Sequence, residues 1–437
     1  MKQIDLLIQP EWLIPIVPKG AVLQDCALAI HQGRIEAVLP TEEATHLYEP
    51  ETIVDLPNQV LLPGLVNAHG HSAMSLLRGY ADDLPLNTWL NEHIWPAESE
   101  WVGEEFVRDG TRLACAELIR SGTTCFSDMY FFPDVTAEAA TQAGLRSRIA
   151  FPVIEFPSAW AQGPDEYLHK GLELHDQYKN HSLVNVAFGP HAPYTVGNST
   201  FERVAVLAEE LDAAIHVHLH ETAQEIDDSL SEHGVRPIDR LNQLGVLGPR
   251  TEAVHMTQVS EDDLDLIKAT NTSVIHCPKS NLKLASGFCP VNKLLTEDIQ
   301  VGLGTDSAAS NNCLNMLEEM RFASLLGKAV SGNATALSAE QSLHMATLGG
   351  ASALGLEAEI GSLEPGKSAD MISVRLDYLS SQPLYDLASQ IVYSSPTQAH
   401  NSWVNGKQLL CDGELQTLNE NEILARASDW RQKISGK

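Results

Sequence analysis

The feature that most constrains the fold is an alternation of strand and helix signals through the middle of the chain. Short apolar runs typical of buried strands occur at 61–67, 123–128, 147–153, 184–189, 214–220, 252–256, 273–277 and 300–305. Helical patterns lie between most of these runs. Eight strand–helix units in succession predict an α/β fold of the (β/α)8 barrel type, with a doubly wound open sheet as the alternative.

Two of the helical segments carry end signals. The segment GEEFVRDGTRLACAELIRSG has apolar residues at helical spacing and is expected to stop at Gly122. The segment STFERVAVLAEELDAA opens with Ser199 and Glu202, which have the spacing of a capping box. Both segments are therefore expected to be connecting helices of the barrel.

The two ends of the chain share a pattern that the middle lacks. CALAIHQGRIEAVLP alternates apolar and polar residues and breaks at QGR, as a hairpin does. Near the other end, Asn405 and Gly406 form a favoured two-residue hairpin turn. We therefore expect residues 1–58 and 361–437, including a C-terminal tail, to form one small β domain that is interrupted by the barrel at 59–360.

Composition limits the partners and the location. The 437 residues include 58 acidic and 28 basic ones, for a formal charge of -30. Phosphate binding needs clustered Lys and Arg, so this balance argues against nucleic acid or an anionic membrane as partner. No run approaches the roughly 18 apolar residues of a membrane span, and the N-terminus lacks the pattern of a signal peptide. The seven cysteines form no CxxC pair, which predicts a reduced, cytoplasmic protein.

Polar side chains follow four of the predicted strands. They are His69 and His71 in NAHGHSAM, His218 in HVHLHETAQE, His255 in AVHM and Asp306 in VGLGTDSAAS. Catalytic residues of a barrel lie at the carboxyl ends of its strands, so these side chains are expected to converge. Imidazole nitrogens with one carboxylate suit Zn²⁺ or Fe²⁺. Each residue alone has a structural alternative, such as a helix cap for the aspartate, but their coincidence at strand ends predicts a metal site.

The stretch HVHLHETAQE places three histidines at alternate positions, directly before a carboxylate. On a strand His216, His218 and His220 would all point to one face. This alternation alone does not identify the histidine that binds a metal.

The motifs above, together with LLPGLVNAHGHSAMSLLRG, HCPKSNLKLASG and LEPGKSADMISV, resemble the amidohydrolase superfamily. Within it the chain is most similar to the methylthioadenosine/S-adenosylhomocysteine deaminases, relatives of the triazine chlorohydrolases, and the resemblance covers nearly the whole chain. It implies a distorted TIM barrel, a small β-sandwich built from both chain ends, and one catalytic zinc per subunit.

The resemblance also implies roles for individual residues. The strand-five ligand of the family lies three residues before the catalytic glutamate, which gives His218 and Glu221. His216 and His220 are left with structural roles or with roles behind the metal ligands. The implied zinc ligands are His69, His71, His218 and Asp306. The implied catalytic groups are Glu221, His255 and Asp306. The implied substrate contacts are Glu98, His191, Glu221, Trp89 and Ser310. A solvated carboxylate at a helix start is the alternative for Glu221.

The loop after the third strand departs from one family pattern. Members that accept S-adenosylhomocysteine can carry an arginine there, available to the carboxylate of the substrate tail. Here AFPVIEFPSAWAQGPDE has no Arg or Lys, and Glu155, Asp165 and Glu166 are acidic. We therefore expect hydrolytic deamination of 5′-methylthioadenosine, with S-adenosylhomocysteine and adenosine as further candidates.

Other functions remain as alternatives or are disfavoured. Deaminases with an H-x-E signature also need PCxxC, which this chain lacks. A dinucleotide fingerprint is disfavoured, because Gly302 and Gly304 are followed by Ser307 where a third glycine belongs. A triazine chlorohydrolase, a guanine or cytosine deaminase, and a metal-dependent binding protein without catalysis are the alternatives. Iron(II) is the alternative metal, and a homo-oligomer, dimer or tetramer, is expected.

Overall fold

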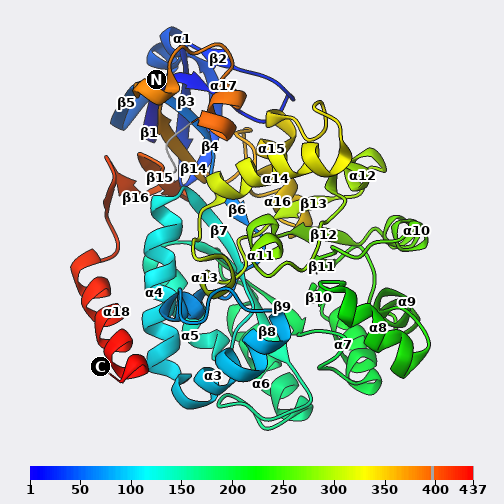
Figure 1. Cartoon of the computed structure of the whole chain (residues 1–437). Helices are drawn as coiled ribbons and strands as arrows, with labels where there is room; N and C mark the ends of the chain where they lie inside the picture. Colours follow the sequence, from blue (N-terminus) through cyan, green and yellow to red (C-terminus); the bar gives the residue numbers. More distant parts are fainter. Residues whose placement is uncertain (395–397, 437) are drawn as a thin grey trace.

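The computed structural model describes residues 1–394 and 398–436, and its centre is a parallel barrel (Figure 1). Eight strands follow one another in chain order from β6 to β13. They are β6 Leu65–Asn67, β7 Thr123–Asp128, β8 Arg146–Val153, β9 Val184–Pro190, β10 Ile215–Leu219, β11 Thr251–His255, β12 Ser273–His276 and β13 Val301–Leu303. The amide of Ala68, just after the first strand, donates to the carbonyl of Leu303 in the last one at 2.8 Å. The barrel prediction is therefore confirmed, and the open-sheet alternative is wrong.

Each predicted run overlaps one barrel strand, and the largest difference is at 61–67. There the long strand β5, Tyr48–Pro63, belongs to a different sheet, where Leu62 and Pro63 pair with strand β14, Met371–Arg375. The apolar run at 61–67 therefore contains the end of one strand and the whole of the next.

Helices connect the barrel strands. They are α4 Glu104–Arg120, α5 Pro133–Ala143, α6 Pro164–Tyr178, α7 Asn198–Glu210, α8 Ala223–His233, α9 Pro237–Gln243, α10 Glu261–Thr270, α11 Pro278–Lys283 and α12 Val291–Thr296. After β13 the chain forms α13 Ala308–Asn311, α14 Met316–Ser331, α15 Ala339–Met345 and α16 Leu348–Ala353. Helix α4 ends just before Gly122, whose φ is +88°, as predicted.

The predicted capping box of helix α7 is wrong, although the helix is present. The helix begins at Asn198 with Gly197 as its cap, and no side chain caps it. Ser199 and Glu202 therefore lie within the first turns. The Glu155 carboxylate accepts the Gly197 amide at 2.8 Å, so a side chain from another loop receives a hydrogen bond at this helix start.

The chain ends meet in a second, mixed sheet of nine strands. Its strands are β1 Lys2–Leu13, β2 Leu23–Gln24, β3 Cys26–His31, β4 Arg34–Pro40, β5, β14, β15 Asn401–Val404, β16 Lys407–Cys411 and β17 Glu414–Leu415. Strands β3 and β4 form the predicted hairpin at Gln32 and Gly33, and β15 and β16 form the one at Asn405 and Gly406. Positive φ angles at all four turn residues match the favoured hairpin turns. The predicted domain of both chain ends is thus present, and its strands form one hydrogen-bonded sheet in which β2 pairs with β1 beside the main series.

The predicted domain limits 1–58, 59–360 and 361–437 stay a prediction. Strand β5 runs through residue 58 to Pro63, and residues 395–397 and 437 lie outside the described residues. The last helix, α18 Glu420–Ser435, packs against barrel helix α4 (Figure 1). There the Trp430 indole donates to Asp109 at 2.8 Å. The C-terminal tail is therefore attached to the barrel.

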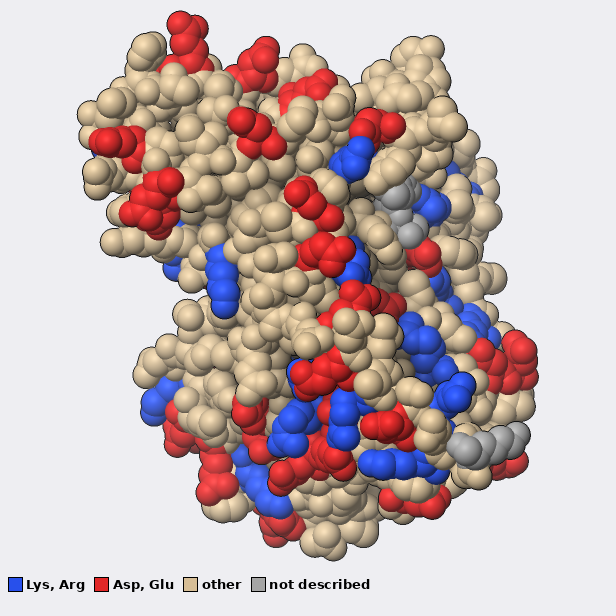
Figure 2. Space-filling view, turned by 90° about the vertical axis from the view of Figure 1, so that its left-hand side faces the viewer, with Lys and Arg blue, Asp and Glu red and all other residues tan. Residues whose placement is uncertain are grey.

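Short helices complete the described chain: α1 Thr41–Leu47, η1 Ser72–Leu77, α2 Leu86–Thr88, η2 Trp89–Ile94, α3 Trp95–Trp101, η3 Leu379–Ser381, α17 Leu387–Ser389 and η4 Gln390–Ser394. None of the helices in 1–394 and 398–436 combines the length and apolar character that crossing a membrane needs. Figure 2 shows acidic groups spread over the upper part of this face and interleaved with Lys and Arg lower down. Among such pairs of opposite charge, Arg112 lies 2.7 Å from Glu422.

Candidate active site

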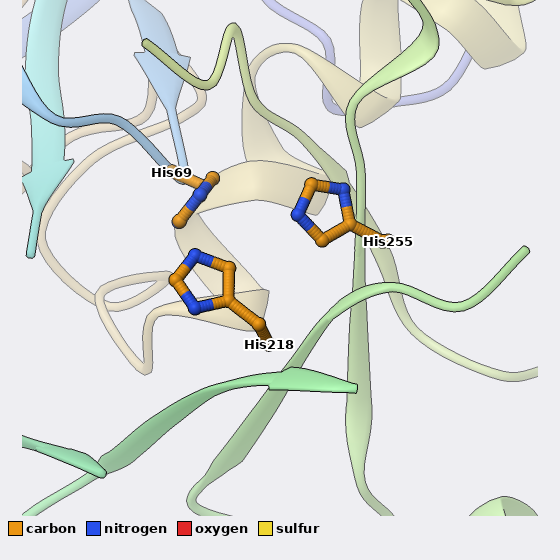
Figure 3. A group of neighbouring side chains, drawn as sticks. All are labelled: His69, His218 and His255. Carbon is orange, nitrogen blue, oxygen red and sulfur yellow. The ribbon is translucent and has the colours of Figure 1, made fainter. Parts of the chain in front are cut away.

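The five predicted polar residues converge at the carboxyl ends of four barrel strands. His69 and His71 follow β6, His218 lies in β10, His255 ends β11 and Asp306 follows β13. The ring centres of His69 and His218 are 4.9 Å apart, and those of His218 and His255 are 5.5 Å apart. Figure 3 shows three of these imidazoles, carried by different strands, pointing toward one point. The tertiary fold thus joins residues that are separated by up to 237 positions (306 − 69).

Unusual backbone geometry shapes these strand ends. A Cβ added to Gly304 would lie 2.8 Å from the Cβ of His69, so only glycine lets β13 approach the histidine this closely. His255 and Asp306 have φ angles of 77° and 61°. Such left-handed conformations cost free energy in residues with a side chain and cluster at functional sites. Gly304 therefore has a packing role, which agrees with rejection of the dinucleotide fingerprint.

Main-chain carbonyls orient two of the imidazoles. Nδ1 of His71 lies 2.6 Å from the carbonyl of Met129, and Nδ1 of His218 lies 2.7 Å from that of His191. A carbonyl only accepts, so Nδ1 carries the hydrogen in both rings. In a neutral ring, Nε2 then keeps a lone pair directed into the site, as a metal ligand requires.

The donor set fits a divalent metal ion. Oδ1 of Asp306 lies 3.4 Å from Nε2 of His69 and 3.3 Å from Nε2 of His71. Tetrahedral bonds of about 2.0–2.2 Å would place two ligand atoms roughly 3.3–3.6 Å apart. In the described part of the chain, the buried Nε2 of His69 has no hydrogen-bond partner. An ion would satisfy this nitrogen, so the site can hold a metal.

Asp306 is fixed from several sides. Its Oδ2 accepts hydrogen bonds from the hydroxyls of Ser280 at 2.5 Å and Ser310 at 2.9 Å, and its Oδ1 accepts from the amide of Ser307 at 2.7 Å. Burial opposes ionisation, but the neighbouring imidazoles outweigh it and hold the pKa of Asp306 well below its usual range. Ser310, predicted as a substrate contact, lines the cavity but donates its hydroxyl to this carboxylate.

Glu221 follows β10 and faces the same cavity. Its carboxylate lies 3.8 Å from Nε2 of His255, and its side chain is only 9% exposed. Burial raises the pKa of Glu221, which favours a carboxyl that holds a proton. The buried position excludes the alternative of a solvated carboxylate at a helix start.

A second glutamate, which the sequence patterns above did not single out, fixes the backbone of this segment. The Glu225 carboxylate accepts the amides of His220 at 3.0 Å and of Glu221 at 2.8 Å. Thr222 caps helix α8, which follows this segment, by accepting the Glu225 amide. The Thr-x-x-Glu spacing in HETAQE could have revealed this arrangement, because it is the pattern of a capping box.

The three alternate histidines of the HVHLHETAQE segment have different environments. His218 faces the metal site, whereas Nε2 of His216 lies 2.7 Å from Nδ1 of His69, behind that ligand. His220 has left the strand with a φ of 54°, and its Nε2 accepts the amide of Ile238 at 3.1 Å. Strict alternation therefore ends between Leu219 and His220. Of the three histidines, His218 faces the metal site, His216 lies behind His69, and His220 bonds to the backbone of a neighbouring helix.

A cavity of about 530 Å³ opens above this cluster. Among its walls are Trp89, Trp95, Glu98, Tyr130, Ile154, Phe156, His191, Tyr194 and Leu284. Trp89 is 5% exposed and comes from η2. The predicted substrate residues Trp89, Glu98 and His191 thus share one cavity with Glu221, and its volume suits a small organic molecule.

Glu98 and His191, which also line this cavity, have shifted pKa values as well. Burial raises the pKa of Glu98 to about 7, although the Tyr130 hydroxyl donates to it at 2.6 Å. Burial lowers the pKa of His191 to about 4, so this ring is neutral, and its Nδ1 lies 3.0 Å from the Thr195 hydroxyl. Tyr130 was not predicted, because its partner Glu98 is distant in sequence.

The acidic residues of the loop after the third strand were expected to face the substrate tail. This expectation is wrong, because their carboxylates are not part of the cavity wall. Glu155 accepts from Gly197 and Thr200, and Asp165 and Glu166 form ion pairs with Arg203 and Lys170, both at 2.7 Å. None of the three carboxylates lines the cavity. The loop contributes Ile154, Phe156, Pro157, Ser158, Ala159 and Gln162 instead. The carboxylates point away because helix starts and basic side chains satisfy them, which leaves a largely apolar wall.

Comparisons with known proteins agree with this geometry. Residues 60–409 match the Amidohydrolase family. A 5-methylthioadenosine/S-adenosylhomocysteine deaminase of Teredinibacter turnerae is 51% identical over 99% of this chain and 98% of that protein. An adenosine deaminase from Xanthomonas campestris with bound zinc is 48% identical, with a TM-score of 0.99 and 100% of both chains covered.

A more distant structure shares the same architecture. An atrazine chlorohydrolase from Arthrobacter aurescens complexed with zinc is 25% identical, with a TM-score of 0.91 over 97% of this chain and 99% of that one. The eight-stranded barrel, the converging histidines with Asp306, and the matches over nearly the full length lead to one conclusion: the chain belongs to the amidohydrolase family.

Proposed function

We propose that the protein is a zinc-dependent hydrolase that removes the 6-amino group of 5′-methylthioadenosine and releases ammonia. The observation that carries the proposal is a buried cluster of metal-ligand type beside the protonatable Glu221, at one end of a cavity that suits a small molecule. The names of the relative from Teredinibacter turnerae and of the zinc-containing adenosine deaminase support the same chemistry.

His69, His71, His218 and Asp306 would hold the zinc ion, or iron(II) in its place. When bound, such an ion lowers the pKa of a coordinated water from 15.7 to about 7 and so makes a nucleophile available at neutral pH. The net reaction adds the oxygen of water to C6 of the adenine ring, breaks the C6–N bond and releases ammonia. The product is the corresponding inosine analogue.

Two side chains would move protons in this reaction, and a third would hold the new oxygen. The Asp306 carboxylate, kept ionised by its neighbours, would accept a proton from the attacking water. Glu221, whose pKa burial raises, would donate its proton to N1 of the ring and so make C6 electrophilic. His255 presents Nε2 to the cavity, because its Nδ1 lies 2.9 Å from the Asn281 side-chain oxygen, and it would hold the new oxygen.

The remaining walls would bind the nucleoside. Glu98 lines the cavity and would accept hydrogen bonds from the ribose hydroxyls, and the neutral His191 would contact the nucleoside. Trp89 would form an apolar wall.

We predict that nucleoside binding tightens as pH rises through about 7, the pKa of Glu98. Above this pH the carboxylate is ionised and accepts two hydrogen bonds, whereas one unit below it only about a tenth is ionised, so affinity should fall up to about tenfold. Dissociation constants measured in a Glu221→Gln background remove the titration of Glu221. Adding Glu98→Gln should flatten the profile; an unchanged slope would assign the titration to another group.

We also predict that 5′-methylthioadenosine exceeds S-adenosylhomocysteine in kcat/KM by at least about tenfold. The tail of the latter carries a carboxylate, and no Lys or Arg occurs among the described residues that line the cavity. Arg78 is engaged elsewhere, by Glu117 and by the carbonyl of Asn312 at 2.6 Å. A buried unpaired charge costs several kcal/mol, of which about 1.4 kcal/mol already gives tenfold. Equal efficiencies would mean that a cation reaches the tail.

Ammonia release from adenosine, 5′-methylthioadenosine, S-adenosylhomocysteine, guanine, cytosine and an amino-triazine tests the proposal directly. Preference for a 6-aminopurine nucleoside supports it, whereas turnover of a triazine or free base alone contradicts it. The chlorohydrolase alternative is tested with a chlorotriazine and chloride release. The cytoplasmic location and the homo-oligomeric state stay predictions from the sequence.

A further inference from the structure

A chain of buried polar side chains runs behind the metal site, through the barrel interior. Nδ1 of His69 lies 2.7 Å from Nε2 of His216, and Nδ1 of His216 lies 2.5 Å from the Glu252 carboxylate. The other carboxylate oxygen of Glu252 accepts from Arg148 at 2.9 Å. The last three residues lie on β10, β11 and β8, with side chains at most 5% exposed. None of them belongs to the groups assigned above to substrate or catalysis.

The direction of each hydrogen bond in this series of side chains follows from Arg148, the residue farthest from the metal site. Arg148 only donates and compensates the charge of Glu252, so the carboxylate accepts from both of its neighbours. Nδ1 of His216 faces this carboxylate and therefore carries a hydrogen, and in the tautomer with a single ring hydrogen its Nε2 must accept. Nδ1 of His69 is then the donor, which leaves the lone pair on Nε2, the buried nitrogen without a hydrogen-bond partner in the described structure.

We propose that Arg148, Glu252 and His216 are positioning residues that fix the tautomer of His69 and thereby set the affinity of the site for its metal. The inference rests on the proposed metal site, and it concerns residues that do not touch the ion. Partners behind metal-binding histidines typically change metal affinity by about 10–100-fold. Here the partner of His69 is another histidine. The direction of both hydrogen bonds therefore depends on the Glu252 carboxylate, which does not itself contact His69.

Glu252→Gln gives a specific expectation. The glutamine carbonyl must face the donor Arg148, so its NH₂ group faces Nδ1 of His216. His216 then donates from Nε2, His69 accepts at Nδ1, and its hydrogen moves to Nε2, where it blocks the metal. Replacing Arg148 as well, in Glu252→Gln/Arg148→Met, frees the amide to turn its oxygen toward His216. The double variant should therefore bind metal more tightly than the single variant.

The protein offers a matched control on the same strand. Arg146, also on β8, forms a buried ion pair with Asp370 at 2.8 Å, and the hydrogen bonds described for these two side chains reach none of the predicted ligands. Asp370→Asn therefore breaks an ion pair of the same kind without changing the direction of the hydrogen bonds behind His69. It reports the effect of general destabilisation on metal affinity.

The experiment measures zinc dissociation constants by competition with a chromophoric chelator, with the melting temperature of each metal-free protein alongside. Zinc binding by the wild type tests the proposed function separately. We expect about 10–100-fold weaker binding for Glu252→Gln, partial recovery in the double variant, and wild-type affinity for Asp370→Asn. Wild-type affinity in Glu252→Gln, or equal losses in Asp370→Asn, would overturn the inference. If Glu252→Gln does not fold, His216→Phe, which removes the acceptor for His69, must weaken binding, and unchanged affinity overturns the inference equally.

Discussion

Glu221→Gln is expected to keep the bound metal and to lose about 10²–10⁴-fold in kcat. Glutamine preserves the shape of the side chain and one acceptor oxygen, but it cannot deliver a proton to N1 of the ring. The buried carboxyl lies beside His255 and outside the proposed ligand set, so the change should leave the metal in place. Steady-state ammonia release gives kcat, and elemental analysis of the purified variant gives the metal content.

Asp228→Asn is the control, because this exposed carboxylate lies on helix α8, which follows Glu221, and bonds only to Gln224 among the described contacts. Its kcat should equal that of the wild type. A loss of less than about tenfold in Glu221→Gln would remove this residue from proton transfer. If the protein only bound its metal and ligand without catalysis, neither the wild type nor any variant would release ammonia. Turnover by the wild type would therefore contradict that alternative.

Removal of the metal is expected to abolish turnover, with a loss of roughly 10³-fold or more, because the ion contributes several kcal/mol to the reaction. Nε2 of His69 has no hydrogen-bond partner in the described structure, and Oδ1 of Asp306 lies 3.4 Å from Nε2 of His69 and 3.3 Å from Nε2 of His71. The proposed mechanism requires a cation at the centre of these groups.

The test is dialysis against a chelator, followed by stepwise return of zinc or iron(II). Activity should reappear and reach its plateau at one equivalent per chain, and the more effective ion identifies the preferred metal. Apo protein incubated with Mg²⁺ is the control, since histidine nitrogens favour zinc and iron over magnesium. Full activity in thoroughly demetallated protein would contradict the proposed mechanism.

Much of the barrel and of its site could be predicted from the sequence, because the relevant signals are local. Buried parallel strands leave short apolar runs, and residues at the strand ends of a barrel must meet. The motifs NAHGHSAM, AVHM and VGLGTDSAAS are therefore expected to lie together on the strength of the sequence alone. The hairpin turns at Gly33 and Gly406 were predictable for the same reason, since two residues determine such a turn.

Local signals failed where a partner from elsewhere in the chain decides the outcome. The capping box of α7 was wrong because Gly197 caps the helix and its amide bonds to Glu155 from another loop. The acidity of that loop was misjudged for a related reason, since Asp165 and Glu166 are neutralised by Arg203 and Lys170 outside the cavity.

The sequence by itself determined which residue types stand at the ends of the strands, because strand periodicity and ligand chemistry are properties of short segments. Only the tertiary structure decided which nitrogen of each histidine faces the site. That choice depends on the Met129 carbonyl for His71, on the His191 carbonyl for His218, and on His216 for His69. Hydrogen-bond direction is set by whichever donor or acceptor packing brings within about 3 Å, and packing joins residues that no local pattern connects.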